Sequence, residues 1–147
     1  LLQQGPNSAN STIVAYGAEG LLRPANKFYM VNNTVVNDRQ GGTFVFVNGG
    51  TSESKVINNV FAGSGSVLSG PGQLESNVVS PQASAILMNP AGYDYRLKPG
   101  SIAIDAGRNP GTANGFELTP KHEYVHTAQK QDRTVTGALD AGAYEFK

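Results

Sequence analysis

The segment His122-Glu123-Tyr124-Val125-His126 has the spacing of a zinc-protease motif, in which two histidines hold the metal and a glutamate activates water. That chemistry requires a helix that places both imidazoles on one face, and a third ligand from elsewhere in the chain. Tyr124 and Val125 favour a strand instead, Pro120 lies just upstream, and no helical periodicity of apolar residues surrounds the motif. We therefore expect an extended segment, with no metal or other cofactor held by this chain.

Aromatic and basic side chains come together in the segment that contains Tyr93, Tyr95, Arg96 and Lys98. The rings could stack on a sugar, and the cations could neutralise an acidic sugar. The same alternation also suits a strand whose basic side chains lay their stems over apolar surface. Both interpretations stay open, and the four residues are candidate substrate contacts.

The adjacent pair Asp38 and Arg39 is a second candidate for substrate contact, in a loop that follows an apolar run. Charges on a loop can contact a ligand, but they can equally form a solvated turn. Both interpretations are kept for this pair.

Composition indicates that short strands position these residues. The chain has 18 glycines and many asparagines, Val is the leading β-branched residue, and Trp and Cys are absent. β-Branched residues suit strands, while Gly and Asn tolerate the positive φ of tight turns. We expect one all-β domain without disulfides.

The charge balance argues against two classes of partner. Lys plus Arg equals Asp plus Glu at 11 each, so no net field would attract nucleic acid or an anionic membrane. No apolar run is long enough to cross a bilayer. The first ten residues read as the continuation of a longer chain, which predicts a processed or excised piece.

A six-residue pattern recurs three times: apolar, any, Asn or Ser, Asn, any, apolar. The copies begin at Met30, Val56 and Leu74, and their second polar positions are Asn33, Asn59 and Asn77. Strand alternation would place the first and last residue of each copy inside, with a bend in αL conformation at the second Asn. The amides of successive copies would then stack as a ladder, about 4.8 Å apart.

Further apolar runs supply a third strand to each coil, and they are 13–16, 43–47, 66–69 and 84–88. An antiparallel sandwich with chance Asn-Asn pairs is the alternative architecture, because short strands separated by turns also fit it. The repeat favours a right-handed parallel β-helix of about three coils.

The coils resemble the last rungs of the pectate-lyase-like right-handed β-helix superfamily, and the tail is similar to the closing module of many bacterial extracellular β-helix proteins. The tail motifs that carry this resemblance are Asp94-Tyr95-Arg96-Leu97-Lys98-Pro99-Gly100-Ser101, Ala103-Ile104-Asp105-Ala106-Gly107 and Gly137-Ala138-Leu139-Asp140-Ala141-Gly142-Ala143-Tyr144-Glu145-Phe146. The resemblance implies β-helix coils over residues 1–92 and a capping module over 93–147, which would cover the open end of the coils. Asp105 and Asp140 fit Asp-x-Gly turns, with calcium binding as the alternative.

The resemblance also implies a secreted or cell-surface protein, of bacterial origin, that acts on extracellular polysaccharide. A parent polysaccharide lyase on uronic acids, with calcium in the parent, is one expectation, and a non-catalytic glycan-binding protein is the other. Lyase chemistry needs a base and a cation on one preorganised face, and the candidate strands for that face carry no charge. We therefore expect this chain alone to be inactive, and to associate with the rest of its parent or another copy at the open N-terminal end.

Overall fold

The computed structural model describes residues 1–125 and 127–147, and it confirms the all-β prediction. Besides two short 3-10 helices, η1 (Ala83–Ala85) and η2 (Pro90–Gly92), the regular elements among the described residues are all strands, joined by turns and loops. The strands are β1 (Leu2–Gln4), β2 (Thr12–Tyr16), β3 (Lys27–Val31), β4 (Thr34–Asn37), β5 (Thr43–Val47), β6 (Glu53–Ile57), β7 (Val60–Gly63), β8 (Ser66–Ser69), β9 (Gln73–Glu75), β10 (Val78–Ser80), β11 (Leu87–Asn89), β12 (Asp94–Leu97), β13 (Thr112–Ala113), β14 (Phe116–Glu117), β15 (His122–Val125) and β16 (Gln129–Asp132).

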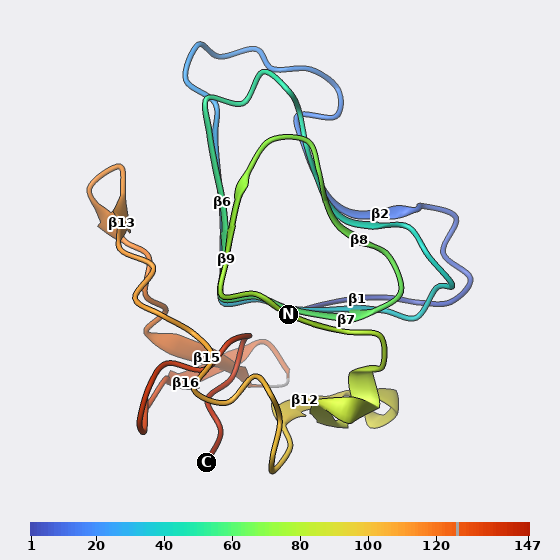
Figure 1. Ribbon diagram of the computed structural model, residues 1–147, viewed down its shortest axis with the longest axis vertical. Coiled ribbons are helices and arrows are strands. Elements are labelled where there is room, and N and C mark those ends of the chain that lie inside the picture. The colour runs from blue at the N-terminus through green and yellow to red at the C-terminus, as the bar shows by residue number, and fades with distance from the viewer. Residues whose placement is uncertain (126) are drawn as a thin grey trace.

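Strands β1 to β10 form parallel sheets, which together we call the three-sheet body (residues 2–80). The sheet orders are β1-β4-β7-β10, β2-β5-β8 and β3-β6-β9, so each pass of the chain adds one strand to every sheet. Parallel neighbours separated by whole passes do not fit an antiparallel sandwich. Figure 1 shows the strands of each sheet one over another, around a shared interior.

The interior of the three-sheet body is apolar and receives side chains from all three sheets. Its buried members are Met30, Val35, Phe44, Val45, Val47, Val56 and Phe61. The rings of Phe44 and Phe61, from two different sheets, lie with their centroids 5.2 Å apart in a tilted pair. Alternation along the strand accounts for Val45 and Val47 on β5, because every second side chain faces the same side, while the adjacent Phe44 at the start of β5 is buried in the same cluster.

The asparagine ladder is present, with the predicted register. Asn59 Oδ1 accepts from the backbone N–H of Asn33 at 2.9 Å, and Asn77 Oδ1 accepts from both Asn59 N and Asn59 Nδ2 at 2.9 Å. Asn59 Nδ2 also donates to the Met30 carbonyl, and Asn77 Nδ2 to that of Val56. The bends are thus held by amides that bridge consecutive passes.

The prediction that these ladder residues adopt αL is wrong by one position. The residues with positive φ are the preceding ones, Asn32 (52°), Asn58 (56°) and Ser76 (48°). Either residue of an Asn-Asn pair tolerates this conformation, so the sequence does not distinguish them.

The predicted apolar rows pair in register, but their last members are not interior. Met30 pairs with Val56 and Val56 with Leu74, yet the exposed fraction of Leu74 is 49%. Val79, which continues the second row, is 50% exposed. Both lie on the last strand of a sheet, where no further pass covers them.

The predicted strand over 84–88 does not extend the β2-β5-β8 sheet. Residues 83–85 form η1, and β11 pairs antiparallel with β12 across the predicted boundary at residue 92. Two prolines, Pro81 and Pro90, flank this stretch and disfavour a continued ladder, since proline has no backbone N–H to donate.

The outer side of the β1-β4-β7-β10 sheet carries a second apolar cluster. Val36, Val60 and Ala62 pack there against the C-terminal part of the chain, which contributes Ile86, Leu87, Tyr95, Leu97, Ala103 and Ala141. Figure 1 shows these C-terminal segments, in yellow to red, beside the sheet. The tail therefore lies on the flank of the three-sheet body rather than across its end, which differs from the expected end cap.

The near-copies around Asp105 and Asp140 bind each other instead of forming two separate turns. Asp140 Oδ1 accepts from the backbone N–H of Asp105 at 2.6 Å, and Asp105 Oδ1 accepts from that of Ala138 at 2.8 Å. Gly107 N also donates to the Leu139 carbonyl at 2.7 Å. These hydrogen bonds join residues 105–107 to residues 138–140, so two distant segments of the tail are held together.

Among the described residues, none of the helices has the length and apolar character needed to cross a bilayer.

Candidate functional site

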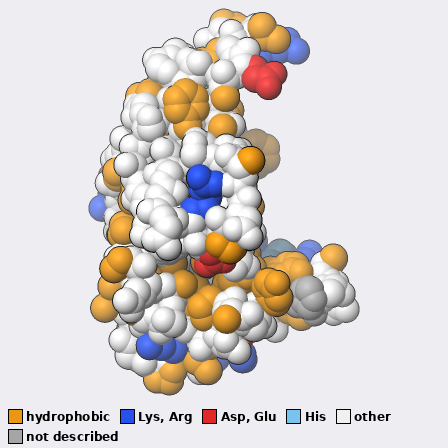
Figure 2. All heavy atoms as spheres, turned by 90° about the vertical axis from the view of Figure 1, so that its right-hand side faces the viewer, with side chains coloured by type: hydrophobic (Ala, Val, Ile, Leu, Met, Phe, Trp, Pro, Cys, Tyr) orange, Lys and Arg blue, Asp and Glu red, His pale blue; other side chains and the backbone are white. Residues whose placement is uncertain are grey.

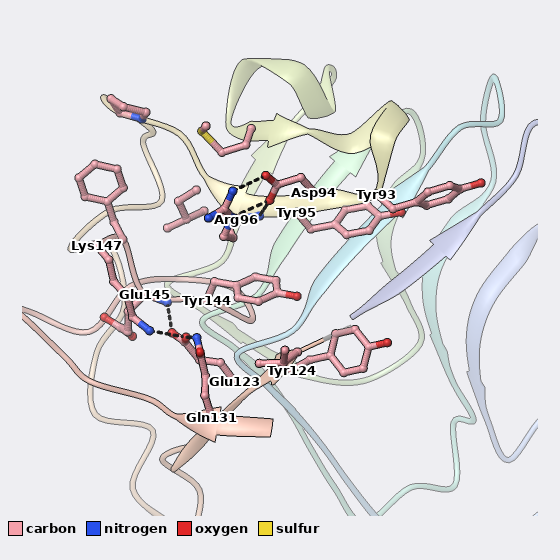
Figure 3. Close-up of a pocket in the computed structure, with 15 residues that line it drawn as sticks. Tyr93, Asp94, Tyr95, Arg96, Glu123, Tyr124, Gln131, Tyr144, Glu145 and Lys147 are labelled. Atoms are coloured by element: carbon pink, nitrogen blue, oxygen red, sulfur yellow. Dashed lines mark hydrogen bonds and ion pairs between the residues drawn. The ribbon is translucent and has the colours of Figure 1, made fainter. Parts of the chain in front are cut away.

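A cleft of about 640 Å³ lies in the C-terminal part of the chain. One wall is formed by Tyr93 and strand β12, and the facing wall comes from β15, β16 and residues 144–147. In Figure 3, the rings of Tyr93, Tyr95, Tyr124 and Tyr144 point in one direction from both walls. The cleft is thus aromatic along one side and bounded by polar side chains behind.

The β12 wall begins with a tight turn. Tyr93 has φ 62° at the end of η2, and Asn89 Oδ1 accepts from Gly92 N to hold that turn. The turn leaves the side chain of Tyr93 75% exposed. A non-glycine residue in the left-handed region is uncommon, and a conformation of this kind is often found at binding sites.

Asp94 and Arg96 form a two-pronged ion pair on this wall. Arg96 Nε donates to Asp94 Oδ1 at 2.8 Å and Arg96 NH2 donates to Oδ2 at 2.6 Å. The Arg96 guanidinium lowers the pKa of Asp94 below its usual value despite partial burial. Asp94 is therefore ionised at neutral pH, and its carboxylate neutralises the charge of Arg96 within the cleft.

The facing wall is organised around Glu123, whose side chain is 1% exposed. Its carboxylate accepts from Lys147 Nζ at 2.9 Å, Gln131 Nε2 at 2.8 Å and the Glu145 backbone N–H at 2.7 Å. Burial alone would raise the pKa of Glu123, but these donors together outweigh burial and lower it. This carboxylate is therefore also ionised and paired.

A buried ion pair supports the same wall from behind. Arg133 NH2 and Glu145 Oε1 lie 2.5 Å apart, and both side chains are 1% exposed. Arg133 also donates to the carbonyls of Gly142 and Asp140 at 3.2 Å. Removing one member would leave a buried charge unpaired, so the pair fixes the C-terminal segment that lines the cleft, residues 144–147.

The structure separates the four candidates predicted in the segment 93–98. Tyr93 and Arg96 line the cleft and are exposed, whereas Tyr95 lines it but is only 6% exposed. Burial raises the pKa of Tyr95, with smaller contributions from Tyr93 and Asp38. Lys98 lies outside the cleft lining and donates to the Ser84 carbonyl at 2.8 Å.

Asp38 and Arg39 lie outside the cleft lining, although Asp38 is linked to Tyr95. Gln3 Nε2 donates to Asp38 Oδ2 at 2.7 Å, and the Tyr95 hydroxyl donates to Gln3 Oε1. Arg39 Nε is enclosed and has no hydrogen-bond partner in the described part of the chain. Figure 2 shows the face over the β2-β5-β8 sheet and its adjoining loops, where charged side chains are few and isolated.

No family model, curated protein or solved structure matches this chain.

The described part of the histidine motif, residues 122–125, forms strand β15, in agreement with the extended segment that was predicted. His122 is the first residue of β15 and is exposed, while Glu123 is buried and lines the cleft. Neighbouring strand residues point to opposite sides, so a shared metal is not favoured for this pair. His126 lies outside the described residues, and within residues 1–125 and 127–147 there is no cluster of three potential metal ligands.

Sequence reasoning missed the facing wall and one charged cluster. Glu123, Tyr124, Tyr144 and Lys147 come from two distant segments, and no local pattern joins them. The charged cluster is on the outer face of β3 and β6, where Glu53 accepts from the Tyr29 hydroxyl at 2.7 Å and pairs with two lysines, Lys27 and Lys55. The register Lys27↔Glu53 could have been found once the repeat set the strand pairing.

Proposed function

We propose that the chain is the C-terminal part of a secreted, right-handed parallel β-helix protein that acts on extracellular polysaccharide. The three parallel sheets and the amide ladder at the bends support the β-helix, since a coil that passes each sheet in turn produces this strand order. Polysaccharide as substrate rests on the resemblance of the tail motifs and on the cleft described above. We further propose that this chain contributes saccharide binding, and that turnover requires other parts of the parent protein.

The observation that carries the binding proposal is the cleft with exposed tyrosines on both walls. Tyr93 and Tyr124 are 75% and 40% exposed, and Tyr144 is partly buried between the walls. Aromatic rings offer flat apolar faces to sugar rings, and the nearby carboxylates and amide can accept or donate hydrogen bonds to hydroxyls. A concave site with a few fixed polar groups is the usual form of a small-ligand site.

Binding is favoured over turnover because the reactive groups of the cleft are already engaged. Asp94 and Glu123 are ionised and paired, so neither is poised to donate a proton near neutral pH. Burial raises the pKa of the third carboxyl in the lining, Glu145, but its side chain is 1% exposed and is paired with Arg133. The strands β2, β5 and β8 carry no Asp, Glu, Lys or Arg. A lyase-type parent would therefore draw its base and its cation from coils outside this chain.

Affinity measurements on the Tyr93→Ala variant test the proposal. The matched control is Phe116→Ala, which removes an equally exposed ring (74%) on β14, outside the cleft lining. We expect Tyr93→Ala to weaken saccharide binding at least about tenfold, while Phe116→Ala leaves it unchanged. Equal effects of the two variants would argue against the cleft as the site.

A further inference from the structure

We propose that the cleft selects an uncharged saccharide over an acidic one, an inference that rests on the proposed binding function and narrows its ligand class. The sequence suggested that Arg96 could neutralise an acidic sugar. In the structure, each cation that lines the cleft has a carboxylate partner inside it. The described lining therefore has no cation left over for a uronate.

The first pair already neutralises the cation that a uronate would use. A guanidinium recognises a carboxylate best through two parallel N–H donors, and Arg96 presents its Nε–NH2 edge in that way to Asp94. The two residues are neighbours on one strand, so the pair forms without ordering another segment. A uronate would have to displace Asp94 from that edge, or bind the NH1–NH2 edge beside the Asp94 carboxylate, which repels it.

The second pair has the same consequence on the facing wall. Lys147 Nζ donates to Glu123, and this carboxylate also holds Gln131 and the Glu145 backbone N–H. Moving Lys147 to an acidic ligand would leave Glu123, which is 2% exposed, with its charge less well compensated. Lys147 therefore stabilises the carboxylate of Glu123 in the wall and does not bind the ligand.

An uncharged sugar avoids both costs. Its hydroxyls can donate to the outer oxygens of Asp94 or accept from the partly exposed Arg96, while its apolar face lies on Tyr93 or Tyr124. Neither ion pair has to break. Binding should then depend little on ionic strength, because no net charge is neutralised.

The test is calorimetric titration of the whole chain with two sets of hexasaccharides at low and high salt. The neutral set is cello-, xylo-, manno- and galacto-hexaose, and the acidic set is oligogalacturonate, oligomannuronate and oligoguluronate of the same length. We expect a neutral ligand to bind at least about tenfold more tightly than any acidic one, with affinity that changes less than about twofold with salt. Tighter, salt-sensitive binding of an oligouronate would overturn the inference and leave the binding function standing, whereas failure of both sets to bind would overturn both.

A charge-releasing variant tests the cause of the selectivity. Asp94→Asn keeps the shape of the side chain but frees the charge of Arg96, so affinity for the oligouronates should rise about tenfold relative to the neutral ligands. Asp132→Asn is the matched control, because Asp132 is exposed and pairs with His122 outside the cleft. Unchanged selectivity in a folded Asp94→Asn variant would contradict the inference.

Discussion

Asn59 is the middle residue of the amide ladder, and its side chain forms hydrogen bonds with both neighbouring passes of the chain. It is fully buried, accepts from Asn33 N, and donates to the Met30 carbonyl and to Asn77 Oδ1. Asn59→Leu would leave these partners unsatisfied, which should lower the free energy of unfolding by about 1 to 3 kcal/mol. Chemical denaturation of the two proteins measures the difference.

The control for this change is Asn109→Leu, at an exposed asparagine whose side chain caps a single local N–H. We expect its unfolding free energy to fall by no more than about 0.5 kcal/mol. If both variants unfolded at the same denaturant concentration as the unaltered chain, the ladder would not stabilise the fold.

The pair Tyr29 and Glu53 makes a prediction about pH. The Tyr29 hydroxyl and the neighbouring lysines lower the pKa of Glu53 to about 2, and the hydrogen bond to Glu53 raises the pKa of Tyr29 to about 12. A lowered carboxyl pKa stabilises the fold above its ordinary value of 4.5, and that contribution is lost as the pH falls toward 2. The raised tyrosine pKa acts in the other direction, since its contribution holds up to pH 10 and is lost as the pH rises toward 12.

NMR titration of the tyrosine Cζ signals measures this coupling. In Glu53→Gln, the pKa of Tyr29 should fall toward its ordinary value of 10, whereas Glu117→Gln, on another exposed carboxylate, should leave it near 12. If the pKa of Tyr29 were the same in Glu53→Gln as in the unaltered chain, the hydrogen bond between Tyr29 and Glu53 would not exist in solution.

At the residue scale, the sequence predicts the ladder well because its evidence is periodic. The spacings of 26 residues from Asn33 to Asn59 and 18 from Asn59 to Asn77 fit one pass each, and the register follows. The αL position could not be predicted, because either residue of an Asn-Asn pair tolerates that conformation. The contact of Asn32 Nδ2 with the Asp140 carbonyl, 108 residues away, could not be predicted either, since no local pattern joins the two segments.

At the scale of elements, the tail is held to the three-sheet body by the first asparagine of two of the bends, Asn32 and Asn58. Asn58 Nδ2 donates to the Arg108 carbonyl at 2.6 Å, Asn58 Oδ1 accepts from Arg108 N at 3.0 Å, and Gly142 N donates to the Asn58 carbonyl at 2.7 Å. The second asparagine stabilises the body from within. One Asn-Asn pair therefore serves two interfaces, which explains why both positions are polar.

Gly142 lies in close contact with the three-sheet body, and its substitution tests the docking of the tail. Its φ is 97°, and a Cβ there would lie 2.7 Å from Thr34 Oγ1 and 3.0 Å from Val60 Cγ2. Gly142→Ala should lower the free energy of unfolding by about 2 to 4 kcal/mol, through backbone strain and displacement of the tail together. Thermal unfolding and hydrogen exchange at Ala143 report the two effects.

Gly111→Ala separates strain from contact, because Gly111 also has positive φ (73°) but a Cβ there meets nothing within 4 Å. We expect this control to cost about 1 kcal/mol and to leave exchange at Ala143 unchanged. Equal losses in both glycine variants would mean that the tail does not dock at Gly142.

The cleft illustrates which part of a site can be predicted from one segment. Tyr93 and Arg96 stand close together in a short aromatic and basic run, so composition alone selects them. Glu123 and Lys147 lie far along the chain and meet them only through the β15–β16 hairpin and the tail. The pairing of Arg96 with Asp94 depends on side-chain geometry, so the sequence could not decide whether the cation was free.

At the scale of the whole molecule, the binding surface and the charge-poor sheets lie on different parts of the chain. The cleft belongs to the C-terminal segments on the flank, while the β2-β5-β8 sheet carries no charged residue on its strands. Asp38 lies exposed on one loop, held by Gln3, and cannot alone provide both a base and a cation. We predict that the chain alone releases no product from alginate or pectate, as followed by the ultraviolet absorbance of unsaturated ends.

The most direct test of binding without turnover is an NMR titration of the isotope-labelled whole chain with the neutral hexasaccharides, with the same samples then analysed for cleaved sugars. The account predicts shifts concentrated at Tyr93, Tyr124 and Tyr144, little change on β2, β5 and β8, and intact ligand after prolonged incubation. Shifts centred on the β2-β5-β8 sheet, or shortened sugars in the presence of this chain alone, would contradict it.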